Sequence, residues 1–151
     1  MDAAFGVHPD FKSHSGGLLK SSIEGGAITA SSSKQKLNTR SSTEAELVAG
    51  DDFMPKILHT QRFLQEQGLK VSKSVLHQDN KSTILLHNKR CQSLGKETTH
   101  IALRYFFIHD VVSRGELEIH HCPAENMIVD YMSKPLQGTS FKKFRKAILV
   151  M

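Results

Sequence analysis

SSTEAELVAGDD, residues 41–52, has the features of a helix start and carries two glutamates. Thr43 and Glu46 have the spacing of a capping box, and Ser41 with Glu44 makes another one two residues earlier. Capping alone would explain both acids. A second interpretation is that one of them does chemistry, and the helical faces separate the two.

Rotation of about 100° per residue places the two glutamates on different faces of the predicted helix. Glu44 falls among polar residues, whereas Glu46 falls on the arc of Phe53, Ile57 and Leu64. A carboxylate at the edge of a buried face costs free energy unless positive charge meets it. No Lys or Arg lies one turn away on that arc. A divalent cation is therefore the expected partner, and Glu46 is its candidate ligand.

The rest of the chain reads as strands alternating with helices. Two strands, at 16–22 and 25–35, are joined by a tight turn at 23–26. The helix from Thr43 runs to about Gly68, and Pro55 inside it should kink or reset it. Further strands are predicted at 74–79 and 116–121, and further helices at 80–88, 100–114, 124–134 and 141–149. This order predicts one α/β layer fold with a mixed sheet.

Length and charge set broad limits on function. The chain has 151 residues, enough for a single domain, and Lys plus Arg exceed Asp plus Glu by 20 to 15. The calculated pI near 9.3 favours a polyanionic partner. Cys91 and Cys122 are far apart and unpatterned, which suits a reducing interior. We find no run of about 18 apolar residues and no signal peptide, so we expect a soluble, intracellular protein without membrane contact.

Three further acids stand where ligands could gather. Asp79 closes the strand at 74–79, at the kind of strand end where open sheets bind ligands, although it could also cap the next helix. Asp130 lies beside an apolar pair in NMIVDYM, and an exposed helical position is its alternative. Asp2 could belong to the same group or to a frayed terminus.

The C-terminal segment 138–151 is basic and contains the helix FKKFRKAIL. Its apolar residues, Phe141, Phe144 and Ile148, are expected to pack on the domain, and a membrane-surface helix is the alternative. In the helix at 100–114, the segment 106–108 (Phe-Phe-Ile) is expected to lie in the core.

Five collinear blocks cover the chain from Asp2 to about Phe144. They are DAAFGVHPDFKSHSGG, SKQKLNTRSSTEAELV, QDNKSTILL, THIALRYFFIHDVVSRGELEIHHCP and NMIVDYMSKPLQG. In this order and spacing, they resemble the ribonuclease H domain at the end of the polyprotein of copia-type LTR retrotransposons. The resemblance implies a ribonuclease H-like layer fold, with a mixed five-stranded sheet flanked by helices.

The resemblance also implies a catalytic set. In this family the second Glu of the STEAE block is catalytic, which agrees with the face argument for Glu46, and the other family acids fall on Asp2, Asp79 and Asp130. The same four residues would hold two Mg²⁺ ions, with Mn²⁺ able to substitute. The implied reaction is hydrolysis of the RNA strand of an RNA–DNA hybrid during reverse transcription.

Substrate contacts follow from the same resemblance. Groups that hydrogen-bond the RNA 2′-hydroxyls are expected at Ser42, Thr43 and Asn80, which could equally be helix caps. Phosphate contacts are expected from the basic side chains Lys34, Lys36, Arg40 and Lys81, for which a solvated face is the alternative.

The resemblance implies a context as well. The parent element carries a reverse transcriptase domain in cis, and its products gather in virus-like particles in the cytoplasm or nucleus. Only Met1 precedes Asp2, so we expect a first strand that is truncated and a chain, 1–151, that is one domain of a longer polyprotein. An inactive nucleic-acid-binding remnant of the same fold is the alternative. A transposase or integrase core is a third possibility, which the TEAE and KPL blocks oppose.

Overall fold

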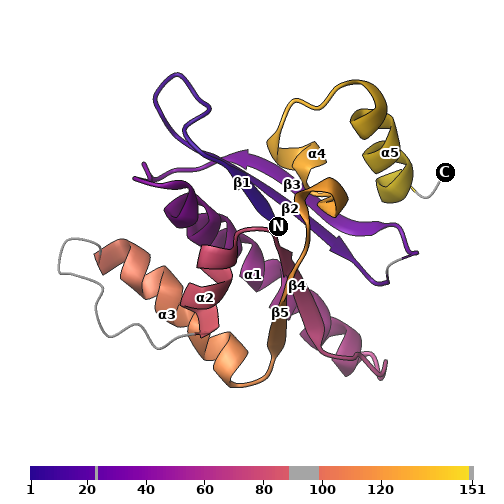
Figure 1. The fold of residues 1–151 in the computed structure, drawn as a ribbon. Coiled ribbons are helices and arrows are strands. Elements are labelled where there is room, and N and C mark those ends of the chain that lie inside the picture. The colour runs from indigo at the N-terminus through magenta and orange to yellow at the C-terminus, as the bar shows by residue number, and fades with distance from the viewer. Residues whose placement is uncertain (23, 89–98, 150–151) are drawn as a thin grey trace.

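The computed structural model describes residues 1–22, 24–88 and 99–149, which form a mixed α/β structure with two small sheets (Figure 1). The strands are β1 (Asp2–Ala4), β2 (His14–Lys20), β3 (Ala27–Lys34), β4 (Ser74–Gln78) and β5 (Leu117–His121). The helices are α1 (Ser42–Glu66), α2 (Lys81–Asn88), α3 (Thr99–Ser113), α4 (Asp130–Ser133) and α5 (Gly138–Leu149), with a 3-10 turn at Ala124–Asn126.

The strands pair as two sheets and not clearly as the single mixed five-stranded sheet that the resemblance implies. β1, β2 and β3 make an antiparallel sheet, and β4 pairs with β5 in parallel. β1 is only three residues long and pairs as a strand with β2. Met1, just before β1, contacts β4: its amine donates to the His77 carbonyl oxygen at 3.2 Å, and its sulfur accepts from the Gln78 amide at 3.8 Å. β1 therefore lies next to β4 without pairing with it as a strand.

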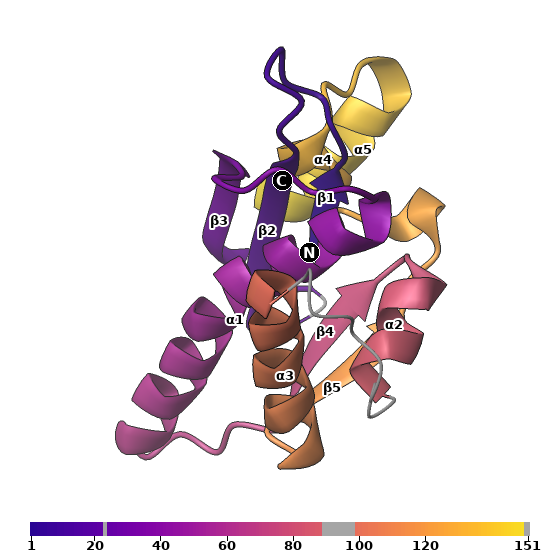
Figure 2. The same ribbon diagram turned by 90° about the vertical axis from the view of Figure 1, so that its left-hand side faces the viewer.

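Helices lie on both sides of the strands. Figure 2 shows α1 and α3 side by side on one side, with α4 and α5 on the other. The core lies between the α1–α3 layer and the strands, and it includes Phe53, Ile57, Ile108, Val111 and Leu117. This packing fixes the start of α1 against β1.

Most predicted elements are confirmed with shifts of a few residues at their ends. The predicted helix from Thr43 is α1, and Gly68 follows its end with a positive φ of 80°, the backbone shape expected after a helix. Pro55 does not reset α1, because the helix continues through it as one element. The end of the chain also follows the prediction, since Phe144 and Ile148 are buried on the inner face of α5.

The predicted helix at 124–134 is wrong. A 3-10 turn at Ala124–Asn126 and the one-turn helix α4 replace it, because the backbone leaves helical angles at Met127 (φ −76°, ψ 85°). Met127 and Val129 are both buried, and two positions apart on one helix would point them to opposite sides. The interruption lets both side chains enter the interior.

Two aromatic residues predicted to be in the core are not there. Phe106 and Phe107 are 51% and 37% exposed, whereas Ile108 is fully buried. α3 buries Tyr105, Ile108 and Val111, a spacing of three that faces one side only. The helix therefore turns the two phenylalanines toward solvent.

Candidate metal centre

The first turn of α1 delivers Glu46 into the interior. Ser41 is the N-cap, and its side chain accepts a hydrogen bond from the Glu44 backbone N–H at 3.2 Å. The capping interpretation is thus correct for Ser41 and Glu44 and wrong for Thr43 and Glu46, because Thr43 already lies inside the helix. Glu46 is left free of any cap, and it is only 4% exposed.

Two neutral donors hold the Glu46 carboxylate. Oε1 accepts a hydrogen bond from the Ala3 backbone N–H at 3.0 Å, and Oε2 accepts one from the Gln78 side-chain amide at 3.1 Å. These donors come from β1 and β4, so the carboxylate lies where the two sheets meet. Its position is set by strands as well as by its own helix.

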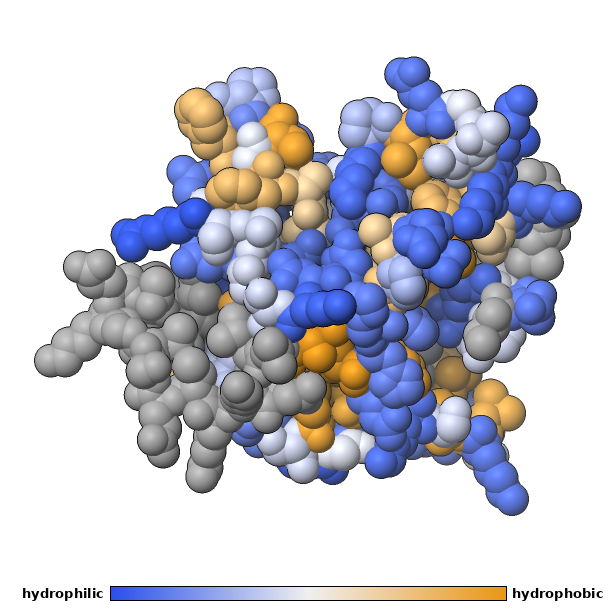
Figure 3. Space-filling model, in the orientation of Figure 1, coloured by the Kyte–Doolittle hydropathy of each residue, from blue (hydrophilic) through white to orange (hydrophobic). Residues whose placement is uncertain are grey.

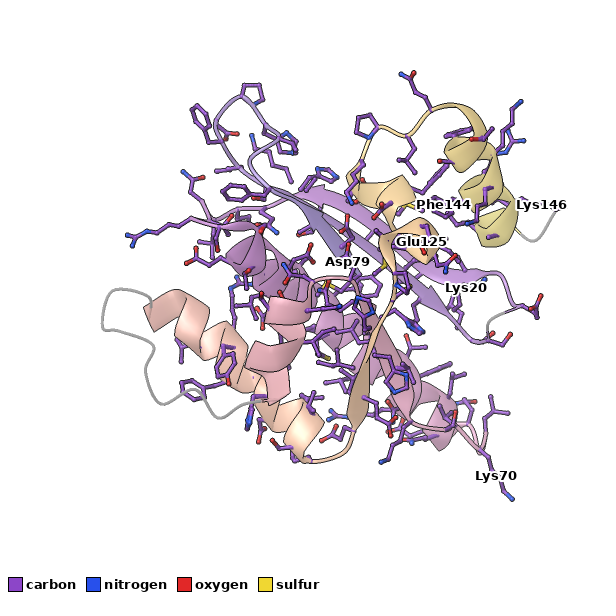
Figure 4. All side chains as sticks on the ribbon, in the orientation of Figure 1. Lys20, Lys70, Asp79, Glu125, Phe144 and Lys146 are labelled. Carbon is purple, nitrogen blue, oxygen red and sulfur yellow. The ribbon has the colours of Figure 1, made fainter. Side chains whose placement is uncertain are left out.

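Asp2 and Asp79 converge on the same place. Asp2 is in β1 and 1% exposed, while Asp79 directly follows the last residue of β4. One carboxylate oxygen from each of Asp2, Glu46 and Asp79 lies within 4.8 Å of the others. Figure 4 labels Asp79 near the middle of the view, where these segments meet. The fold thus assembles three carboxylates from separate parts of the sequence.

Crowding and burial change the acidity of these groups. Burial and, after it, the neighbouring charge of Asp2 raise the pKa of Glu46 to about 8, against the hydrogen bonds from Gln78 and Ala3, which act in the opposite direction. Burial also lowers the pKa of the Met1 amine, although the surrounding carboxylates oppose that shift. The buried Glu46 carboxylate therefore holds its proton more readily than an ordinary glutamate does.

Asp130 lies beside this group, at the start of α4. It does not belong to the three acids whose oxygens lie within 4.8 Å. The Lys134 Nζ links it to the cluster, at 3.0 Å from Asp130 Oδ1 and 3.4 Å from Asp2 Oδ2. Burial raises the pKa of Asp130, against the hydrogen bond from Lys134. The structure thus brings three of the four predicted acids together and ties the fourth to them through a lysine.

The residues present fit a hard divalent cation. The donor set of the three-acid group is carboxylate oxygen, the ligand type that Mg²⁺ and Mn²⁺ prefer over softer metals. A cation would also relieve the repulsion that raises the pKa of Glu46. The same oxygens offer nothing to a soft metal such as Cu(I).

Two of the predicted substrate residues act as local structure in this protein. Asn80 accepts a hydrogen bond from the Thr83 N–H at 3.1 Å and so caps α2. Lys34 pairs with Asp10 at 2.8 Å. Both roles are compatible with later contact to a ligand, because the Lys34 side chain remains 44% exposed.

The other predicted substrate residues keep some contact with solvent. In the first turn of α1, Ser42 is exposed and Thr43 is half-buried. Lys81 is exposed at the start of α2. Arg40 is exposed just before α1, and its backbone N–H donates to Glu44 Oε2 at 2.6 Å. A hollow of about 370 Å³ lies between β2, β3 and α1, with Lys34, Lys36 and Lys56 along it. None of the three acids lines this hollow.

The surface around the site is mixed. Figure 3 shows a hydrophilic centre with an apolar patch directly below it, and a second apolar patch at the upper left, where Figure 1 draws the loop after β1. That loop exposes Phe5, Val7 and Phe11.

Sequence reasoning missed three residues whose side chains contact the acids. The Gln78 amide donates to Glu46 Oε2 at 3.1 Å. The Ser133 hydroxyl donates to Asp2 Oδ2, and Lys134 contacts both Asp2 and Asp130. Lys134 could have been found, because it stands four residues after Asp130 and such pairs meet on a helix. Ser133 has no comparable signal, since its partner lies 131 positions away.

Comparison with known proteins places the chain among mobile elements. The Retrovirus-related Pol polyprotein from transposon RE2 of Arabidopsis thaliana is 35% identical over 126 residues, which are 82% of this chain and 8% of that protein. The Retrovirus-related Pol polyprotein from transposon TNT 1-94 of Nicotiana tabacum is 30% identical over 137 residues, 91% of this chain and 10% of that protein. The Transposon Ty1-NL2 Gag-Pol polyprotein of Saccharomyces cerevisiae is 30% identical over 148 residues, which are 93% of this chain and 8% of that protein.

No family model and no solved structure matches the chain. In the part of the chain that the structure describes, no helix combines the length and the apolar character needed to cross a membrane. The chain spans 8–10% of the length of the curated relatives it matches. Its homologues are the Pol polyproteins of copia/Ty1-type retrotransposons, and it corresponds to one segment of them.

Proposed function

We propose that the chain is the ribonuclease H domain of a copia-type retrotransposon polyprotein. Its reaction is endonucleolytic hydrolysis of the RNA strand of RNA–DNA hybrids formed during reverse transcription. The observation that carries this proposal is the convergence of Asp2, Glu46 and Asp79 within 4.8 Å at a buried junction of strands and helix. Carboxylates from three separated segments meet in this way where metal ions act on phosphodiesters.

The arrangement of the strands supports the proposal. The bond from the Met1 amine to His77 puts β1 beside β4, so the five strands follow the order β3, β2, β1, β4, β5. With antiparallel pairing on one side and parallel pairing on the other, this is the order that a ribonuclease H-like layer fold requires. Asp2 then lies on one central strand, and Asp79 lies directly after the end of its neighbour.

The four acids would hold two Mg²⁺ ions, or Mn²⁺ in their place. When bound, the ions supply a water of lowered pKa and stabilise charge on the leaving oxygen. Gln78 and the Ala3 N–H orient Glu46, and the Ser133 hydroxyl orients Asp2. These contacts fix the carboxylates in place before any ligand arrives, which limits the reorganisation that binding requires.

Recognition of the hybrid would use the rim of the site. Ser42, Thr43 and Asn80 lie close to Glu46 or Asp79 in the sequence and offer hydrogen-bonding groups to 2′-hydroxyls. Lys34, Arg40 and Lys81 offer positive charge to phosphates. The reverse transcriptase domain of the parent polyprotein would be the partner in cis, within a virus-like particle inside the cell.

The test is cleavage of a labelled RNA–DNA hybrid in Mg²⁺, by the chain alone and joined to the reverse transcriptase segment of its parent polyprotein. Asp79→Asn should abolish cleavage and leave the fold intact by circular dichroism. Asp110→Asn, an exposed acid on α3, is the matched control and should cleave like the parent. Cleavage that survives Asp79→Asn would refute the proposed site.

A second candidate is an inactive nucleic-acid-binding remnant of the same fold. The observation that favours it is Asp130, which pairs with Lys134 instead of joining the three-acid group. Hybrid binding without cleavage, in both the short and the joined protein, would support the remnant.

A further inference from the structure

Lys134 lies at the end of α4, where one turn of helix brings its side chain back over Asp130. Its backbone N–H donates to the Asp130 carbonyl oxygen at 2.9 Å, and its Nζ donates to Asp130 Oδ1 at 3.0 Å. The same Nζ lies 3.4 Å from Asp2 Oδ2. One ammonium group therefore spans two carboxylates from opposite ends of the sequence.

The two sides of the acidic cluster carry different counter-charges. On one side, Glu46 takes its hydrogen bonds from two neutral amides, and its oxygen lies within 4.8 Å of oxygens from Asp2 and Asp79. The Met1 amine also interacts with these acids, but burial lowers its pKa and so weakens it as a counter-charge. On the other side, the Lys134 ammonium bridges Asp2 and Asp130. A divalent ion would be attracted to both sides, but on the second side it would compete with a charge already present.

We propose that the Lys134 ammonium is a built-in cation that occupies the Asp2–Asp130 side in the metal-free protein and leaves when a second divalent ion binds there. This inference rests on the proposed function, because it assumes that the acids hold two ions. It makes loading ordered: the first ion enters among Asp2, Glu46 and Asp79, and the second displaces Lys134.

The exposure of these side chains gives the ammonium a way out. The Asp2 side chain is 2% exposed, whereas that of Lys134 is 38% exposed and so reaches solvent. A lysine carries one compact charge on a flexible stem and can swing into water without dismantling a rigid fork of hydrogen bonds. Asp2 keeps the hydrogen bond from Ser133 when the lysine leaves.

A permanent structural ion pair is the competing explanation. In that case Lys134 would stay between the two aspartates whether or not metal is present. Its removal would then weaken the fold and leave the affinity for the second ion unchanged or lower. Metal binding and side-chain accessibility distinguish the two explanations.

The first experiment counts Mn²⁺ ions on the protein by calorimetry and by the electron paramagnetic resonance of free Mn²⁺. Lys134→Met should tighten the second binding step by about tenfold, the order expected when one partly exposed competing charge is removed. Lys134→Arg, which keeps the charge, should bind like the parent. Lys142→Met, on α5, is the control for a general loss of positive charge.

The second experiment uses the unaltered protein and does not depend on a variant that folds. Lysines are labelled by reductive methylation, and the products are read by mass spectrometry with and without Mg²⁺. Lys134 should be protected in metal-free protein and should become several-fold more reactive once Mg²⁺ saturates the site, while Lys142 stays the same.

The outcomes separate this inference from the proposed function. Unchanged second-ion affinity in Lys134→Met, or unchanged labelling of Lys134 with Mg²⁺, overturns the inference and leaves hybrid cleavage untouched. Two ions bound with a tighter second step in Lys134→Met support the inference even if the hybrid is not cut. If the parent binds no Mn²⁺, or if Asp79→Asn binds as much Mn²⁺ as the parent does, both the inference and the proposed function are overturned.

Discussion

At the scale of single residues, Glu46 is the acid whose burial costs the most folding free energy when it is ionised. A carboxylate that is 4% exposed and close to Asp2 and Asp79 is held by two hydrogen bonds from neutral groups and by no matching charge within its own helix. Folding that buries such a group without a cation destabilises the protein when the group is ionised. The burial of Glu46 therefore suits the proposed state, in which a cation is bound.

The pH dependence of stability should reveal this cost. The pKa of Glu46 rises from 4.5 to about 8 on folding, so between these values the folded protein keeps a proton that the unfolded chain has lost. The free energy of unfolding in metal-free buffer should therefore fall as pH rises through this window, by up to about 5 kcal/mol from Glu46. Denaturant unfolding of the parent and of Glu46→Gln, from pH 5 to 8, measures the difference. Equal pH dependence in the two proteins would contradict the raised pKa.

Part of this residue-level account could be predicted from the sequence. The rotation of a helix separates Glu46 from Glu44 without any coordinates, and the structure buries the one on the apolar arc. The cap could not be assigned, because Ser41 and Thr43 both precede a glutamate at the same spacing. Only the backbone of Ser41, extended at φ −151°, shows where the helix begins.

At the scale of elements, Ser41 caps the start of α1, whereas Thr43 lies inside the helix and does not cap it. Ser41→Ala removes the side-chain acceptor for the Glu44 N–H and should lower the free energy of unfolding by about 1 kcal/mol. Thr43→Ala, inside the helix, should change it by less than about 0.5 kcal/mol. Thermal unfolding measures both. A larger loss from Thr43 than from Ser41 would mean that the cap is misplaced.

Two adjacent glycines in β2 let helices approach both sheet faces. A Cβ on Gly17 would overlap the buried ring of Phe53 from α1, and one on Gly16 would lie 3.1 Å from Ser133 of α4. Gly17→Ala should therefore destabilise the protein by roughly 1–3 kcal/mol, since the ring must leave its place in the core. Ser33→Ala, exposed on β3, is the control. Wild-type stability of Gly17→Ala in urea unfolding would show that the α1–β2 contact is loose.

Strands and long helices could be located from periodicity, but the segment 124–134 could not. Its apolar residues fit a helix on paper, and the break at Met127 follows from the need to bury both Met127 and Val129. That need arises from the surrounding layers, which a single sequence does not display. The division into two sheets was missed for a similar reason, because the three-residue β1 pairs with β2 alone.

At the scale of the whole molecule, the three acids lie at the junction of the two sheets, which do not pair with each other as strands. Asp2 belongs to the three-stranded sheet, and Asp79 follows a strand of the other sheet. Glu46 comes from α1 and accepts hydrogen bonds from Ala3 of the first sheet and Gln78 of the second. The Met1 amine donates to the His77 carbonyl oxygen between the two sheets. A cation held by all three acids would therefore connect the two sheets as well as serve chemistry.

The last prediction follows from that connection. Mg²⁺ that binds only the folded state should stabilise the whole chain, by about 2.7 kcal/mol at a hundredfold excess over its Kd. Asp79→Asn should be more stable than the parent in metal-free buffer, because it removes one of the repelling charges, and should gain little from Mg²⁺. Asp110→Asn should gain as much as the parent. Thermal unfolding over a range of MgCl₂ concentrations, at constant ionic strength, measures the gain. The same gain in Asp79→Asn as in the parent would place the Mg²⁺ elsewhere and would leave the junction between the sheets without the cation assigned to it.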